Sequence, residues 1–109
     1  MKETYPCVYL VALDSGLHKV GMTENLPHRL QTMKSNCGGL TLLNHWRCAD
    51  RHSARFYEKW IHARLWRYHT SGREFFSLPN RVVEFMSKVS NDCIKAVAKK
   101  EYHACGSYE

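Results

Sequence analysis

Four residues of this 109-residue chain have side chains that suit the hydrolysis of a phosphodiester bond: Tyr9, Lys19, Arg29 and Glu58. Such hydrolysis needs a base that activates water, cations that hold the phosphate, and a carboxylate that anchors a divalent metal ion. A tyrosine has an ordinary pKa of about 10, so it acts as a base near neutral pH only where a neighbouring cation or a metal-bound water favours the phenolate. The chemistry therefore depends on whether the fold brings these four residues together.

The first two elements that we expect form a hairpin. Residues 5–13, YPCVYLVAL, are nearly all β-branched, aromatic or aliphatic, which predicts an interior strand that is buried on both faces. Asp14-Ser15-Gly16 is typical of a tight loop, and residues 17–22 have the pattern of a returning strand.

The length of the loop determines which residues face each other across the hairpin. With a three-residue loop, Val11 lies opposite Lys19 and Tyr9 lies opposite Gly21. Tyr9 and Lys19 then share one face as diagonal neighbours, whereas a four-residue loop would put them on opposite faces. Because Gly21 has no side chain, we expect a recess beside the phenol that fits a water molecule or a phosphate oxygen.

Two predicted helices carry the other two residues. Asn25 is a typical N-cap and Pro27 suits a first helical turn, which predicts a helix that continues to about residue 35. Arg29 lies one turn into this helix, so its guanidinium can point back over the recess. Asp50 is the predicted N-cap of a long helix over residues 51–68, which contains Glu58.

Glu58 falls on the apolar stripe of that long helix, with Ala54, Ile61 and Leu65. A carboxylate on a stripe that faces the core needs a partner, because an unpaired buried charge is unstable. Three kinds of partner stay open: a cation such as Lys19 or Arg29, the helical neighbour His62, or a bound metal ion.

The remaining elements complete the expected fold. Residues 40–49 predict a third strand, residues 73–78 a short extended piece ended by Pro79, and residues 80–100 a final helix. Together they predict an α+β fold, with a small three-stranded antiparallel sheet flanked by helices, in a single domain over residues 1–109.

The composition favours a polyanionic partner. Lys and Arg number 16 against 10 Asp and Glu, which gives a net charge of +6. No apolar run is long enough for a membrane span or a signal peptide, so we expect a soluble cytoplasmic protein without a membrane partner, in the host cell if the protein is viral.

The cysteines and nearby histidines indicate no strong metal or disulfide framework. The five cysteines are odd in number and irregularly spaced, which argues against structural disulfides and favours free thiols. His45 and Cys48, with Asp50 and His52 nearby, make a zinc site conceivable, but structural zinc is not expected because no CxxC motif occurs.

A series of basic residues follows the long helix and its flanks. Basic side chains that track a phosphate backbone, with aromatic side chains that stack on bases, are typical of nucleic-acid binding. The interleaved tryptophans Trp46, Trp60 and Trp66 are more readily explained by packing, while the basic series fits either binding or solubility. Its members are Arg47, Arg51, Arg55, Lys59, Arg64 and Arg67.

With these residues in view, the chain resembles the GIY-YIG nuclease superfamily over about residues 8–78. Cys7-Val8-Tyr9 stands where the first motif has Gly-Ile-Tyr, and Lys19-Val20-Gly21 where the second has Tyr-Ile-Gly. The sequence is most similar to the phage and bacterial branch with a Lys-Ile/Val-Gly-x-Thr second motif. That branch carries a Gly-Glu-Trp-Phe-like segment, here represented by residues 72–76 with Arg73 inserted.

The resemblance implies metal-dependent cleavage of DNA, with RNA as an alternative substrate. Tyr9 would be the general base, Lys19 would assist it and the phosphate, Arg29 would hold the scissile phosphate, and Glu58 would bind a single Mg²⁺ or Mn²⁺ ion. Further residues are accessory candidates, among them a positional match for a late asparagine of the superfamily: Gly21, His62, Glu74 and Asn80.

Two other functions stay open from the sequence. One is a catalytically inactive nucleic-acid-binding module of the same fold, and the other is a protein-interaction or inhibitor protein. Cleavage of plasmid DNA in the presence of a divalent metal ion distinguishes a nuclease from both alternatives, and DNA binding at low salt distinguishes the two alternatives from each other.

Overall fold

The structure, a computed structural model, describes residues 4–72 and 74–92 of the chain. The elements follow one another along the chain in an α+β arrangement, as predicted. They are β1 (Cys7–Leu13), β2 (His18–Thr23), α1 (Leu26–Cys37), β3 (Leu40–Arg47), α2 (Arg51–Arg64), a 3₁₀ turn (Trp66–Tyr68), β4 (His69–Ser71), β5 (Phe75–Phe76) and α3 (Asn80–Lys88).

The sheet has five strands in the order β3-β1-β2-β5-β4, and its pairings are antiparallel. The prediction of a three-stranded sheet was therefore wrong in number, although β3, β1 and β2 are the three predicted strands. The two additional strands contain only three and two residues, β4 at His69–Ser71 and β5 at Phe75–Phe76. Strands this short carry no alternation that a sequence pattern can reveal.

The predicted register of the first hairpin is confirmed. Val11 pairs with Lys19, and Tyr9 pairs with Gly21. Gly16 in the loop has a φ of 93°, a left-handed conformation that glycine adopts without steric cost. Tyr9 and Lys19 consequently lie on the same face of the sheet.

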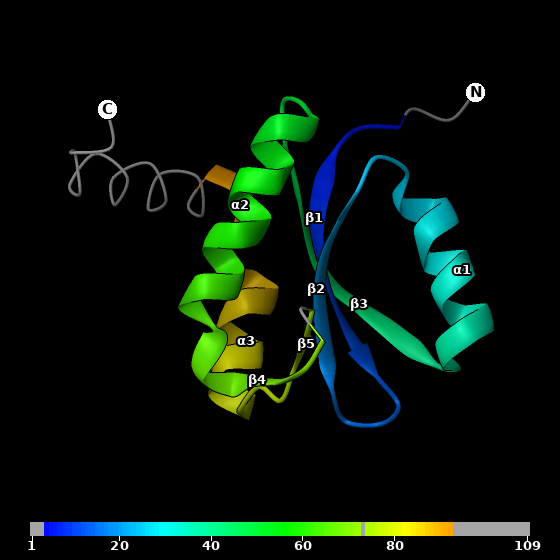
Figure 1. The fold of residues 1–109 in the computed structure, drawn as a ribbon, viewed down its shortest axis with the longest axis vertical. Coiled ribbons are helices and arrows are strands. Elements are labelled where there is room, and N and C mark those ends of the chain that lie inside the picture. Colours follow the sequence, from blue (N-terminus) through cyan, green and yellow to red (C-terminus); the bar gives the residue numbers. More distant parts are fainter. Residues whose placement is uncertain (1–3, 73, 93–109) are drawn as a thin grey trace.

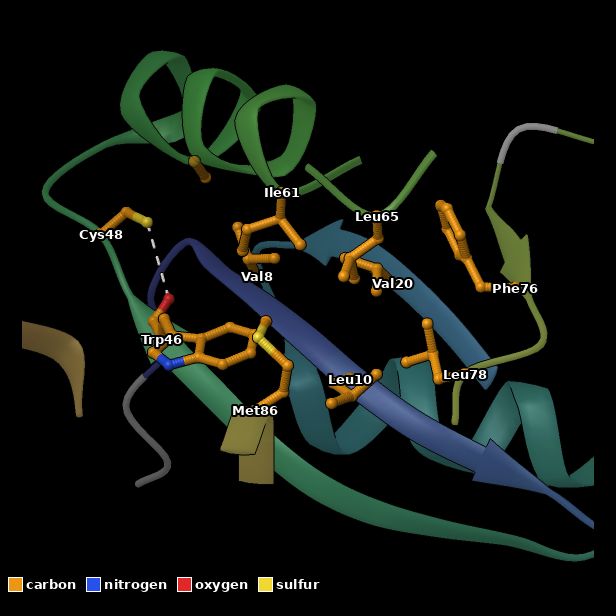
Figure 2. Close-up of a cluster of buried hydrophobic side chains, with 11 residues drawn as sticks. Val8, Leu10, Val20, Trp46, Cys48, Ile61, Leu65, Phe76, Leu78 and Met86 are labelled. Carbon is orange, nitrogen blue, oxygen red and sulfur yellow. Dashed lines mark hydrogen bonds between the residues drawn. The ribbon is translucent and has the colours of Figure 1, made fainter. Parts of the chain in front are cut away.

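The sheet lies between helix α1 on one side and helices α2 and α3 on the other (Figure 1). Each side holds a hydrophobic cluster. Helices α2 and α3 cover one face, where the larger cluster includes Val8, Leu10 and Val20 from the sheet and Ile61 from α2 (Figure 2). Helix α1 covers the other face, where Tyr9, Val11 and Met33 form the smaller cluster. Alternate residues of β1 thus enter opposite clusters, which explains why this strand is apolar throughout.

Helix α2 begins as predicted and ends early. The Asp50 side chain accepts a hydrogen bond of 2.7 Å from the Ser53 amide, which satisfies an otherwise unpaired donor at the helix start. The prediction that the helix continues to residue 68 was wrong, because α2 ends at Arg64 and a 3₁₀ turn follows. The turn lets the chain reverse into β4 while Leu65 stays buried.

Helix α3 is shorter than predicted. It ends at Lys88, and Val89 has an extended backbone, so a continuous helix to residue 100 was wrong. The Asn44 amide donates to the carbonyl oxygens of Met86 and Val89, and the Trp46 indole also donates to Val89. These side chains of β3 replace the amides that a continuing helix would supply. The part of the predicted helix from residue 93 onward lies outside the described residues.

None of the helices described, over residues 4–72 and 74–92, has the length and apolar character needed to cross a membrane.

Candidate active site

Tyr9 and Arg29 make a direct contact over Gly21. Arg29 Nε donates a hydrogen bond of 3.3 Å to the Tyr9 hydroxyl oxygen. This hydrogen bond and the charge interaction with Tyr9 raise the pKa of Arg29, against the opposing effect of burial. The predicted approach of the α1 guanidinium to the Tyr9 hydroxyl is thus observed.

The space beside Gly21 is filled rather than open. A Cβ atom added at Gly21 would lie 2.6 Å from Cζ of Tyr9, and the Tyr9 side chain has no exposed surface. The expectation of a recess that admits a water or a phosphate oxygen was therefore wrong in this structure. The phenol itself occupies the volume that the missing side chain leaves, with Arg29 hydrogen-bonded to its oxygen.

Lys19 pairs with a carboxylate that neighbours β5. Its ammonium Nζ lies 3.3 Å from Oε1 of Glu74 and 5.5 Å from the centre of the Phe75 ring. The Lys19 side chain is only 12% exposed, while that of Glu74 is 35% exposed. The ammonium is therefore held at the sheet and largely withdrawn from water.

His62 fastens helix α2 to the outer edge of β2. Its Nε2 atom lies 2.7 Å from the Val20 carbonyl oxygen. Since a carbonyl oxygen can only accept, Nε2 carries the hydrogen of this bond. The Val20 amide in turn donates a hydrogen bond of 3.1 Å to the carbonyl oxygen of Glu74. Both polar groups of Val20 thus hold a residue of the candidate site.

Glu58 lies one helical turn before His62 and is half-buried. Burial is the main reason that the pKa of its carboxyl is raised, and the negative charge of Glu74 adds to this effect. The positive charges of His62, Arg55 and Lys59 act in the opposite direction. Within residues 4–72 and 74–92, Glu58 makes no ion pair, so the predicted pairing with Lys19 or Arg29 is not found.

The candidate residues approach strand β2 from the two faces of the sheet. Arg29 comes from α1 on one face, and Glu58 comes from α2 on the other face. Between them, the charge of Glu74 acts on both Arg29 and Glu58. The predicted residues thus form two separate pairs, Arg29 with Tyr9 and Lys19 with Glu74. The charge of Glu74 links these pairs to Glu58.

Comparison with models of protein families shows to which family the chain belongs. The model of the T5orf172 domain matches residues 5–98. The chain belongs to the T5orf172 domain family. This family is related to the GIY-YIG nuclease fold, so the predicted resemblance is confirmed at that level, while the finer branch stays a prediction. No curated protein and no solved structure matches the chain.

In this T5orf172 domain, Glu58 fits the role of an oxygen ligand to a hard divalent cation. Mg²⁺ usually keeps several waters and uses one or two carboxylates together with substrate phosphates. A half-buried carboxylate with a raised pKa and no ion pair gains from a nearby cation. No group of three or more His, Cys, Asp or Glu side chains in the described ranges is arranged to hold a metal by itself.

The residues considered for zinc lie apart. His45 pairs with Tyr9 across β1 and β3, on the α1 side of the sheet. Cys48 belongs to the cluster on the α2 side, where its thiol donates to the Trp46 carbonyl oxygen. Cys7 and Cys48 are both buried free thiols, and burial raises the pKa of Cys7 to about 11.

The basic residues of the T5orf172 domain fall on separate surfaces. Arg51, Arg55 and Lys59 lie on the Glu58 side of α2, and Arg51 pairs with the exposed Glu24 at 3.4 Å just after β2. Arg47 lies on the opposite edge strand, β3, where its guanidinium stacks on the Tyr5 ring. The basic series predicted from the sequence is therefore not one continuous surface.

The last two basic residues of the series border a groove between α2 and α3. The groove has a volume of about 490 Å³ and a mostly apolar lining that includes Ile61, Leu65 and Met86. Arg64 and Arg67 line it together with Arg81. Its lining includes none of Tyr9, Lys19, Arg29 and Glu58, so this groove is not the candidate active site.

The packing explanation holds for two of the three tryptophans, Trp46 and Trp60, and not for Trp66. Trp46 is buried and Trp60 is half-buried, whereas Trp66 is 52% exposed and stacks on His69. Asn80, the positional match for the late asparagine, is exposed at the first residue of α3. No hydrogen bond or ion pair described above joins it to the other candidates.

Glu74 is the residue whose importance the sequence understated. It was only an accessory candidate, but its side chain pairs with Lys19 and its charge acts on two further candidates. The available signal was its position directly before two aromatic residues within the predicted extended piece. That signal could not identify Lys19 as its partner without the pairing of β5 with β2.

Proposed function

We propose that this T5orf172 domain is a metal-dependent DNA endonuclease that hydrolyses phosphodiester bonds. The observation that carries the proposal is the hydrogen bond between Arg29 and the Tyr9 hydroxyl. It lies beside strand β2, which carries Lys19 and is joined by His62 to the helix that carries Glu58. A base, two cations and a carboxylate are the groups that this reaction uses.

Tyr9 is the proposed general base. Its oxygen accepts from a guanidinium, so negative charge that develops on this oxygen during proton removal is stabilised where it forms. Arg29 now covers that oxygen. A substrate phosphate that draws the guanidinium toward itself uncovers the hydroxyl for an attacking water, which couples substrate binding to activation of the base.

Arg29 and Lys19 are the proposed phosphate-binding cations. A guanidinium presents a planar set of donors that matches two phosphate oxygens, and an ammonium supplies a point charge. Both side chains lie on the α1 face of β2, so one phosphate can contact both. Charge that accumulates on the phosphate during attack is then met by preorganised cations.

Glu58 is the proposed ligand of a single Mg²⁺ or Mn²⁺ ion, and Glu74 is an acidic group whose charge acts on it. When bound, such an ion stabilises charge on the phosphodiester and its leaving group. The hydrogen bond from His62 to the Val20 carbonyl oxygen holds helix α2 against β2, and it would thereby keep Glu58 in a fixed position relative to the substrate site.

The proposed DNA surface continues from Glu58 along the near flank of α2. Arg51, Arg55 and Lys59 follow at helical spacing and are exposed. Replacing Arg55 and Lys59 by Gln should lower the slope of log affinity against log salt by about 2, because two phosphate contacts are lost. The paired change of Arg64 and Arg67 to Gln, on the other flank, is the control and should leave the slope nearly unchanged.

Nicking of supercoiled plasmid with Mg²⁺ or Mn²⁺ tests the activity. The wild-type protein should nick the plasmid, EDTA should abolish nicking, and Glu58→Ala should reduce it by at least about 100-fold. A failure to nick supercoiled, linear and single-stranded DNA with either metal would remove the proposal.

A second candidate function is a nucleic-acid-binding module without cleavage. The complete burial of Tyr9 favours it, since no water reaches the hydroxyl in this arrangement. This alternative predicts salt-dependent DNA binding that Glu58→Ala preserves, with no nicking by the wild-type protein. A protein-interaction or inhibitor function predicts neither nicking nor DNA binding at low salt.

A further inference from the structure

Glu74 is the one acidic side chain in the described ranges that acts on three of the proposed catalytic residues. Its carboxylate pairs with the Lys19 ammonium at 3.3 Å. Its charge also raises the pKa of Arg29, and it raises the pKa of Glu58. An anion therefore already pairs with Lys19, one of the two cations that are proposed to receive the scissile phosphate, and its charge also acts on the other, Arg29.

A phosphodiester can take the place of this carboxylate. Both groups carry one negative charge and offer two oxygen acceptors to an ammonium or a guanidinium. They cannot both stay beside Lys19, because two like charges about 4 Å apart repel each other strongly at a partly buried site. The binding of a phosphate at Lys19 therefore requires the Glu74 side chain to leave.

The backbone allows the side chain to move while the strand stays. The Glu74 carbonyl oxygen is held by the Val20 amide at 3.1 Å, directly before β5. The side chain has freely rotating bonds and is 35% exposed, so its carboxylate can turn into water without loss of strand pairing. Lys19, at 12% exposed, has no such freedom and stays at the site.

We propose that Glu74 is a counter-ion that the scissile phosphate displaces from Lys19, and that it thereby determines which anions the site accepts. The inference rests on the proposed nuclease function. A single inorganic phosphate must displace Glu74 with only local contacts. A DNA strand also gains contacts at Arg51, Arg55 and Lys59, so it overcomes the competition where a small anion does not.

Glu74→Gln tests the proposal, because it keeps the size of the side chain and removes the charge. A 20-base-pair duplex labelled with a fluorophore is titrated by anisotropy in EDTA at low salt, with inorganic phosphate as competitor. The variant should bind the duplex at least about fivefold more tightly than wild type, and phosphate should compete more effectively. Glu84→Gln, an equal charge change at an exposed residue of α3, should change affinity by less than about twofold.

A double-mutant comparison locates the effect. In a Lys19→Met background, Glu74→Gln should gain no more than Glu84→Gln does, because the displaced ion pair no longer exists. If Glu74→Gln unfolds, the side-chain Nε–H resonance of Arg29 in the wild-type protein supplies a second measurement. It should shift when the duplex is added and stay nearly unchanged with inorganic phosphate at the same concentration.

Three results would overturn the inference: equal gains from Glu74→Gln and Glu84→Gln, weaker duplex binding by Glu74→Gln, or an Arg29 resonance that does not respond to the duplex. Weaker binding together with a loss of metal-induced stabilisation would instead make Glu74 a metal ligand. These measurements contain no cleavage step. A protein that shows the expected binding without nicking plasmid would contradict the nuclease proposal and leave the counter-ion role in place.

Discussion

The two faces of the sheet differ in what their buried side chains do. The α2 and α3 face holds a large cluster of apolar side chains, among them Ile61 and Phe76, which contributes mainly hydrophobic stabilisation (Figure 2). The α1 face holds a smaller cluster in which the hydroxyl of Tyr9 meets a guanidinium. The same strand, β1, supplies both faces. Val8 and Leu10 pack in the larger cluster, whereas Tyr9 between them presents its hydroxyl to Arg29 on the other face.

This comparison predicts that loss of a single oxygen on the α1 face has a large effect on activity and a small effect on stability. Tyr9→Phe should reduce plasmid cleavage by about 10²–10⁴-fold, the range for removal of a general base. The free energy of unfolding should change by less than about 1.5 kcal/mol, because one hydrogen bond is lost and the ring remains. Single-turnover cleavage and urea denaturation measure the two quantities.

Tyr57→Phe is the matched control for that change. Tyr57 packs against the cluster on the α2 face and is half-buried, and burial raises the pKa of its hydroxyl. The same loss of oxygen there should leave cleavage within about threefold of wild type. Equal effects of the two changes would mean that the α1 face has no chemical specialisation.

The opposite experiment removes apolar volume from each face. Ile61→Ala should lower the free energy of unfolding by about 3–4 kcal/mol, since its side chain is enclosed by the larger cluster. Met33→Ala on α1 should cost less, about 2 kcal/mol, because the smaller cluster has fewer neighbours and can collapse into the space. Urea denaturation of both variants tests the ranking, and a greater loss for Met33→Ala would reverse the comparison.

Gly21→Ala should disturb the α1 face from within. The added Cβ would lie 2.6 Å from Cζ of Tyr9, so the ring must move, at a cost of roughly 1–3 kcal/mol in stability. Movement of the ring breaks the hydrogen bond from Arg29, so cleavage should also fall. In a Tyr9→Ala background the same substitution should cost little, and a persistent cost there would locate the clash elsewhere.

The sequence was sufficient for the parts of this arrangement that depend on local patterns. The three-residue loop fixed the pairing of Tyr9 with Gly21, and the N-caps Asn25 and Asp50 located the helices that carry Arg29 and Glu58. These features depend on residues within a few positions of one another, where propensity and hydrogen bonding decide the structure.

The parts that depend on contacts across long stretches of sequence could not be predicted in this way. The pair Lys19–Glu74 exists because β5 joins β2, and β5 contains only two residues. The end of α3 depends on side chains of β3 that lie more than 40 positions earlier, at Asn44 and Trp46. Neither relation leaves a periodic signal, so pattern analysis predicted a longer helix and could not identify Glu74 as the partner of Lys19.

The smallest predicted effect on stability concerns Glu58, which lies on α2 and is proposed to take part in the chemistry of the α1 face. Its folded-state pKa is raised above the ordinary value of 4.5, chiefly by burial. Relative to the unfolded chain, folding therefore favours the protonated form of Glu58. Its contribution to stability is fully present below pH 4.5 and is lost as the pH rises through the raised value.

Glu58→Gln should consequently be more stable than wild type at pH 7, by less than about 1 kcal/mol because water still screens a half-buried group. The difference should shrink as the pH falls toward 4. Urea denaturation at several pH values measures it, and a destabilised variant at pH 7 would show that the carboxylate has a favourable partner in the folded protein. Mg²⁺ or Mn²⁺ should stabilise wild type and not Glu58→Gln, since a ligand that binds only the folded state raises its stability. Equal stabilisation of both proteins by the metal would place the ion elsewhere, and the α2 face would then be confined to packing.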